Sequence, residues 1–270
     1  MQILSIISIG LFVGIVMGLT GAGGGILAVP ALVFAMGWSM QTSTPVALLA
    51  VTMGAAFGAI HGLRQKQVRY RAAMLMAAAG MPITALGVRA AHAVPQTLLM
   101  GGFALILLVV GARLLRDKRN SDISNAQTCF AKIDPSTGRF DWTLTAVAAI
   151  TSIGALAGFT AGLLGVGGGF IIVPMLKRFT NASMHIAVAT SLLVIALVGA
   201  ASFTSYLAHG AVIPWMLASI FAGATALGMG VGRAFNRSFS PQAVQTTFAV
   251  LLLVVAVYLM LKASDLVVRL

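Results

Sequence analysis

Apolar residues gather in ten segments along the chain, and these segments form two groups of five. The first group covers residues 3–19, 26–37, 43–63, 72–91 and 96–115, and the second covers residues 143–163, 168–179, 186–208, 213–232 and 240–261. Most segments have the roughly 20 residues that a helix needs to cross about 30 Å of hydrocarbon. The second segment of each group is too short to cross alone unless the bilayer is thin or protein surrounds it. The pattern predicts an all-α polytopic membrane protein with eight to ten transmembrane helices.

The two groups are related by an internal repeat at an offset of 144 residues. Residues 18–30 read GLTGAGGGILAVP and residues 162–174 read GLLGVGGGFIIVP, so that eight of thirteen positions are identical. A polar stretch separates the copies and carries ten of the 22 charged residues. We therefore predict transmembrane repeat 1 at residues 1–112, a cytoplasmic polar linker at 113–142 and transmembrane repeat 2 at 143–270.

The uneven distribution of Lys and Arg between the loops predicts the topology. If all ten segments cross, one side receives 14 of these residues and the other receives three, in line with the positive-inside rule. Each half then has an odd number of crossings, so the halves are inverted and both termini lie outside the cytoplasm. If the short segments dip in and return, eight spans remain, the split is 12 to 5, the halves are parallel and the termini are cytoplasmic. We favour the inverted arrangement.

The composition excludes several classes of function. Only 8% of the residues are charged, whereas a soluble domain carries about 25%, which excludes soluble enzymes and DNA-binding modules. The net charge of +12 reflects Lys and Arg that set topology, and we expect no nucleic-acid partner. No apolar segment contains Asp or Glu, and Cys129 is the single cysteine. We therefore expect no catalytic residues, no metal site and no cofactor.

The duplicated glycine clusters are the first candidate for substrate binding. They comprise Gly21, Gly23, Gly24 and Gly25 in the first copy and Gly165, Gly167, Gly168 and Gly169 in the second. Residues without Cβ let the backbone leave helical geometry, which membrane proteins tolerate only where protein buries it or it lines a wet cavity. A short helix that begins after the glycines would direct its free N–H groups and positive dipole end at that cavity, which suits an anion. The alternative is that the glycines only allow close helix packing.

Other polar residues and two prolines complete the candidate set. We predict that Pro30 and Pro174, five residues past the last glycine of each cluster, mark helix breaks. The hydroxyl groups are available either to an oxyanion or to their own helix backbone; they belong to Ser43, Thr44, Thr190 and Ser191. Arg89 and Arg233 coincide under the repeat, and each either attracts an anion or extends to the membrane interface. His61 and His209 are candidates for a proton role, because the spans contain no carboxylate.

The duplicated element Gly-Leu-x-Gly-x-Gly-Gly-Gly-(x)4-Pro, with Ala-Thr-Ser-Leu at residues 189–192, resembles the sulfite exporter TauE/SafE family of membrane transporters. The resemblance covers residues 8–262. It implies an inner-membrane permease with about eight spans that moves sulfite, sulfonates or related sulfur-containing or organic anions, and it places the glycines and prolines of both copies in the family's signature. The first copy departs from this pattern, because it has Pro-Val-Ala-Leu at residues 45–48.

These features together predict a secondary transporter of small anions in the cell inner membrane, with the anion bound between the glycine-broken helices of the two repeats. The expected partners are the lipid bilayer, a small anionic substrate and a coupling ion, either a proton or sodium; the oligomeric state is left open. A passive anion channel has the same composition and is the alternative. An intramembrane enzyme is disfavoured, because the sequence offers no carboxylate pair, Cys–His couple or metal cluster.

Overall fold

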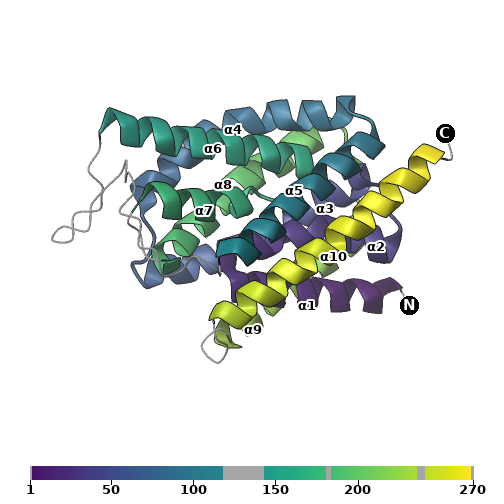
Figure 1. The fold of residues 1–270 in the computed structure, drawn as a ribbon, viewed down its shortest axis with the longest axis horizontal. Coiled ribbons are helices and arrows are strands. Elements are labelled where there is room, and N and C mark those ends of the chain that lie inside the picture. The colour runs from purple at the N-terminus through teal and green to yellow at the C-terminus, as the bar shows by residue number, and fades with distance from the viewer. Residues whose placement is uncertain (1, 118–142, 181–183, 236–240, 269–270) are drawn as a thin grey trace.

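The computed structural model describes residues 2–117, 143–180, 184–235 and 241–268, which form a bundle of helices (Figure 1). The first half contains α1 (Gln2–Thr20), the 3-10 helix η1 (Gly21–Leu27), α2 (Ala28–Met36), α3 (Met40–Arg64), α4 (Tyr70–Ala93) and α5 (Gln96–Asp117). The second half contains α6 (Leu144–Leu164), α7 (Gly169–Phe179), α8 (Met184–Ala208), α9 (Trp215–Phe235) and α10 (Pro241–Val268). The expected all-α fold is confirmed.

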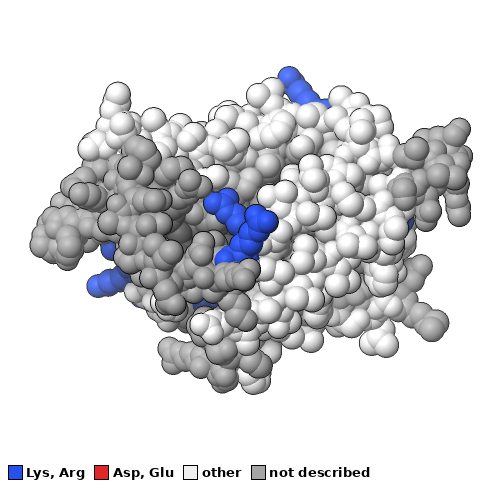
Figure 2. Space-filling view, in the orientation of Figure 1, with Lys and Arg blue, Asp and Glu red and all other residues white. Residues whose placement is uncertain are grey.

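Eight of the described helices are long and apolar enough to cross a membrane: α1, α3, α4, α5, α6, α8, α9 and α10. The short second segments become α2 and α7, of nine and eleven residues. The first part of α2 is enclosed by protein, since Val29, Leu32 and Val33 are fully buried, whereas Phe34 near its end is exposed. Figure 2 shows that the described surface on one face is mostly uncharged, with Lys and Arg at only a few positions. This is the surface of a multi-pass membrane protein.

Local signals explain several helix ends. The hydroxyl of Ser39 accepts a hydrogen bond from the Thr42 N–H at 3.2 Å and caps α3, and Thr143 caps α6 in the same way through the Ala146 N–H. Gly37 ends α2 in the left-handed conformation, with φ of 65°, which glycine adopts without steric cost. Helix α5 continues to Asp117, so it includes the first five residues of the linker that the sequence predicted at 113–142. Residues 118–142 lie outside the described part of the chain.

The main helix contacts join one half of the chain to the other. Helix α1 packs against α9, α4 against α6, α5 against α10 and α3 against α8. At the 144-residue offset α1 corresponds to α6 and α4 to α9, so the first two contacts are equivalent and the last two pair a helix with its own counterpart. This pattern agrees with the predicted repeat. The predicted regions 1–112 and 143–270 thus interleave rather than pack as separate bodies.

Glycines set the distance between the helices at the two equivalent contacts. A Cβ added at Gly158 of α6 would lie 2.7 Å from the Cα of Gly80 in α4, and one added at Gly228 of α9 would lie 3.1 Å from the Cα of Gly14 in α1. Helices in a bilayer gain little hydrophobic free energy by associating, so close backbone packing contributes much of their affinity.

The two termini lie at the same end of the molecule, on the right in Figure 1, and α6 begins at the opposite end. The ten-segment topology requires this arrangement, whereas the eight-span alternative would put the start of α6 and the termini on one side. Eight of the described helices are long enough to cross a membrane, so the number of crossings and the inversion of the halves both stay predictions.

We expect Gly158→Ala to lower the stability of the protein. The added methyl group overlaps the Gly80 backbone, and overpacking costs about 1–3 kcal/mol. Thermal unfolding in detergent, followed by intrinsic fluorescence, measures the change. Gly102→Ala is the matched control, because nothing lies within 4 Å of its Cβ position in α5 and alanine favours a helix by about 0.5–1 kcal/mol. Equal melting temperatures for the two variants would contradict this explanation.

We expect a label at residue 125 and a label at the C-terminus to lie on opposite sides of the membrane, because the ten-segment topology puts five crossings between them. Single cysteines introduced at these two positions in a Cys129→Ser background, treated with a membrane-impermeant thiol reagent in intact cells, report the exposed side. Labelling of both positions from one side would support eight spans and parallel halves.

Candidate functional site

The two glycine clusters have similar sequences but different backbone conformations. In the first, Gly21 has a positive φ of 76°, and Gly23, Gly24 and Gly25 continue as the 3-10 helix η1. In the second, Gly165, Gly167 and Gly168 all have positive φ, near 70°, and the chain turns sharply before α7 begins at Gly169. Both clusters leave α-helical geometry, as predicted.

The prediction of a free helix N-terminus after each cluster is wrong for the first half. Helix α2 follows η1 without interruption, and the Ala28 N–H donates to the carbonyl of Gly25, so the donors at the start of α2 are already used. In the second half α7 starts after a left-handed residue, and its first bonded donors are the Ile171 and Ile172 N–H groups, both directed at the Gly168 carbonyl. Only α7 therefore has the kind of N-terminus that the sequence suggested.

The prediction of helix breaks at the prolines is also wrong. Pro30 is the third residue of α2, which continues through it to Met36. Pro174 lies inside α7, which continues to Phe179. The breaks lie instead at the glycines, because positive φ values end an α-helix.

Each glycine cluster packs against the long helix of the opposite half. The Cβ position of Gly165 lies 3.0 Å from the carbonyl oxygen of Thr44 in α3, and that of Gly21 lies 3.1 Å from a methyl carbon of Val188 in α8. Thr44 and Val188 correspond at the 144-residue offset, so the two contacts are equivalent. Any larger side chain at either glycine would push the broken backbone away from α3 or α8.

The four predicted hydroxyl groups are buried, and they have different partners. Thr44 donates to the Met40 carbonyl at 2.7 Å, and Ser191 donates to the Val188 carbonyl at 2.8 Å. The Thr190 hydroxyl accepts from the backbone N–H of Arg69 at 3.1 Å, a contact between α8 and the start of α4. The Ser43 hydroxyl is fully buried and has no hydrogen-bond partner. Ser43 and Thr190 are thus the two of the four whose oxygen is not used by its own helix.

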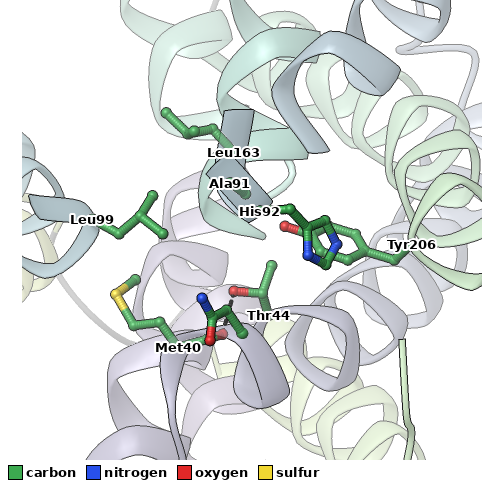
Figure 3. A pocket seen from close by; sticks show the side chains of 8 residues that line it. Met40, Thr44, Ala91, His92, Leu99, Leu163 and Tyr206 are labelled. Carbon is green, nitrogen blue, oxygen red and sulfur yellow. Dashed lines mark hydrogen bonds between the residues drawn. The ribbon is translucent and has the colours of Figure 1, made fainter. Parts of the chain in front are cut away.

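A small cavity lies beside Thr44, between the start of α3 and the ends of α4, α6 and α8 (Figure 3). Its polar lining groups are Gln41, Thr44, His92 and Tyr206. The cavity measures about 10 Å³, which is room for about one water molecule. The Tyr206 side chain is almost fully buried, and its hydroxyl donates to the Gly162 carbonyl at 2.8 Å. Tyr206 therefore ties α8 to the end of α6, just before the second glycine cluster.

The two histidines that are candidates for a proton role, His61 and His209, lie in different surroundings. His61 is exposed at the end of α3, where its Nε2 lies 2.9 Å from Nε2 of Gln65. His209 lies at the end of α8 and stacks on His92, with ring centroids 6.1 Å apart and planes at 19°. His92 also contacts the Tyr206 ring at 5.8 Å. His92 was not among the residues predicted from the sequence, because 117 residues separate it from His209 and no local signal indicates this contact.

The two candidate arginines, Arg89 and Arg233, differ in how far they are exposed. Arg89 is exposed on α4, whereas Arg233 of α9 is half-buried and its Nη1 donates to the Gly58 carbonyl of α3 at 2.9 Å. Arg233 therefore reaches into the bundle, and Arg89 does not. Among residues 2–117, 143–180, 184–235 and 241–268, no three His, Cys, Asp or Glu side chains lie together in a way that would hold a metal ion.

Comparison with known proteins places the chain among membrane transporters. The family described as sulfite exporter TauE/SafE matches residues 6–259. A "Probable membrane transporter protein" of Xylella fastidiosa is 27% identical over 254 residues, which cover 93% of this chain and 92% of the relative. The "Probable membrane transporter protein YunE" of Bacillus subtilis is 23% identical over 263 residues, 94% of this chain and 96% of the relative. No solved structure matches the chain.

We expect Gly165→Ala to destabilise the protein more than Gly37→Ala. Both glycines have positive φ, where alanine costs about 1–2 kcal/mol. At Gly165 the new methyl group also overlaps Thr44, whereas nothing lies within 4 Å at Gly37, so a further cost of about 1–3 kcal/mol applies only to Gly165→Ala. Melting temperatures in detergent compare the two variants. An equal effect would mean that backbone strain alone, and not the contact with α3, is what the glycine at 165 is needed for.

Proposed function

Because the chain belongs to the sulfite exporter TauE/SafE family, we propose that it is a secondary transporter of small anions in the cell inner membrane. The proposed substrates are sulfite, sulfonates or related sulfur-containing or organic anions. The proposed binding region lies between the glycine-broken backbone of each half and the α3 or α8 helix of the other half.

The observation that carries the proposal is the chemistry of the buried polar groups. The eight candidate spans contain no Asp or Glu, while hydroxyl groups at Ser43, Thr44, Thr190 and Ser191 are buried within α3 and α8. Of these four, the Ser43 hydroxyl has no partner and the Thr190 hydroxyl accepts a hydrogen bond, whereas Thr44 and Ser191 donate to their own helix. A neutral donor holds an anion without a compensating charge, and hydrogen bonds to an ionised group are stronger than those between neutral groups. A cation would have only carbonyl and hydroxyl oxygens to bind. The interior therefore favours an anion as the transported species.

The size of the cavity beside Thr44 bears on the mechanism. A cavity of about 10 Å³ is too small for a sulfur oxyanion, since it has room for about one water molecule. We propose that the described conformation is closed at this end and that the anion enters when α3 and α8 move relative to the glycine clusters. Transporters built from two repeats commonly alternate access by movement of one repeat against the other.

A transporter and a channel differ in whether transport can build a gradient. We propose coupling to a proton or to sodium, with the His92–His209 pair at one end of α8 as the candidate for a proton role. The exposed position of His61 on the opposite half gives it no comparable contact with a buried aromatic group.

Purified protein in liposomes should move sulfite at a rate well above that of empty vesicles. The test uses vesicles loaded with sulfite and measures its release, first with no ion gradient and then with an imposed proton or sodium gradient. Dimethyl sulfone, a neutral sulfur compound of similar size, is the control solute and should not be transported.

Three results would separate the interpretations. Accumulation of sulfite against its own gradient, driven by the imposed ion gradient, would establish secondary transport. Release that only follows the sulfite gradient would establish the passive channel. Rates equal to those of empty vesicles for sulfite, sulfonates and small carboxylates would refute anion transport.

A further inference from the structure

Helices α3 and α8 cross antiparallel through the middle of the bundle, and a few close contacts define how they align. Gly62 lies against Ala189, Gly58 against Leu192 and Gly199 against Thr52. Among these contacting pairs, a higher residue number in α3 goes with a lower one in α8, so the start of α3 faces the end of α8. The small residues let the two backbones approach closely. This crossing joins the two halves, and each glycine cluster packs against one of its two helices.

Most of the hydroxyl groups in the described helices bond to their own backbone. Thr20, Thr44, Thr84, Thr180, Ser191 and Thr225 each donate to a carbonyl three or four residues earlier. This is the usual way for Ser and Thr to satisfy their hydrogen in an apolar interior. Among the described residues, the buried hydroxyl oxygens without any partner belong to Ser43, Thr52 and Ser202.

The Thr52 hydroxyl lies at the α3–α8 crossing, and Ser202 lies on α8 within one helical turn of that contact. The Thr52 hydroxyl points at the α8 backbone, so closely that it would overlap a Cβ at Gly199. Ser202 follows Gly199 by three residues, which places it about one helical turn away on an adjoining face of α8. Its side chain is fully buried. A buried donor without an acceptor destabilises the state that contains it, so two such groups in one place call for an explanation.

Further polar groups continue from this pair toward both ends of the crossing. On one side, Tyr206 lies one turn beyond Ser202, and it lines the small cavity together with Thr44 and His92. On the other side, Arg233 reaches the Gly58 carbonyl, and Thr190 lies at the far end against the Arg69 backbone. Polar side chains therefore follow the α3–α8 interface from one end of the bundle to the other, through surroundings that are otherwise apolar.

We propose that Thr52 and Ser202 donate hydrogen bonds to the oxygen atoms of the transported oxyanion as it passes the α3–α8 crossing. This inference rests on the proposed function and adds two binding residues to it. Both groups are neutral donors, which suits sulfite or a sulfonate: each has several acceptor oxygens, and the negative charge strengthens the bond. In the closed conformation the two donors have no acceptor, and an anion supplies one when the helices separate.

The test compares sulfite transport by Thr52→Val, Ser202→Ala and the double variant in proteoliposomes. Valine has nearly the shape of threonine and lacks only the hydroxyl group. We expect each single variant to raise the KM for sulfite about tenfold, the loss expected for one hydrogen bond to a charged group. Thr52→Ser keeps the donor and should restore a KM close to that of the unchanged protein.

Matched controls remove hydroxyl groups that bond to their own backbone. Thr225→Val on α9 removes a buried hydroxyl that donates to Phe221, and Thr204→Val on α8 removes an exposed one that donates to Ala201. Both controls should leave the KM within about twofold of the unchanged value. Melting temperatures of all variants show whether a lower rate reflects loss of folded protein.

The outcomes distinguish this inference from the proposed function. If the unchanged protein moves no anion above empty vesicles, the proposed function fails and the inference falls with it. If it moves sulfite and the double variant has an unchanged KM, the binding role of Thr52 and Ser202 is refuted while anion transport stands. If Thr52→Val does not fold, Ser202→Ala decides alone. A raised KM that Thr52→Ser fails to restore would also overturn the role of the Thr52 hydroxyl.

Discussion

The contact of each glycine cluster with the long helix of the other half is the constraint on which the arrangement depends. Gly165 packs against Thr44 of α3, and Gly21 packs against Val188 of α8. The approach at Gly165 includes backbone atoms of Thr44 and the one at Gly21 involves the Val188 side chain, and residues without Cβ permit both together with positive φ. The result is that non-helical backbone, which lipid does not tolerate, is enclosed by protein in both halves.

Helices of one half pack against helices of the other half throughout the bundle. Helix α1 of the first half packs with α9 of the second, and α6 of the second packs with α4 of the first, each through glycines that bring the backbones together. The halves therefore interleave, and each supplies the surroundings that the other's short helix needs. A membrane protein gains little from burying apolar side chains away from lipid, so this dependence on close packing has a physical cause.

The packing of α3 against α8 also decides which buried hydroxyl groups have a hydrogen-bond partner. On the exposed face of α8 a threonine bonds to its own backbone, as Thr204 does, and is not available to a ligand. At the α3–α8 crossing Thr52 and Ser202 do not. The neighbouring cavity beside Thr44 and Tyr206 has room for about one water molecule. Membership of the sulfite exporter TauE/SafE family and a carboxylate-free set of spans agree with donors arranged for an anion.

The hydrophobic pattern by itself determined the class of the protein and the approximate bounds of the apolar helices, and the glycine clusters indicated where the backbone leaves α-helical geometry. The predicted segment 186–208 became α8 at Met184–Ala208, because hydropathy and helix geometry act over a few residues. The same local reasoning placed the breaks at Pro30 and Pro174, although the positive φ values of Gly165 and Gly168 end the helix. It also expected two similar helix N-termini, whereas η1 runs directly into α2. Only the tertiary structure decided that Arg233 meets Gly58, that His92 stacks on His209 and that Thr52 faces Gly199. Each of these contacts joins residues more than a hundred positions apart, so their meeting is set by how whole helices pack and not by any pattern within one of them.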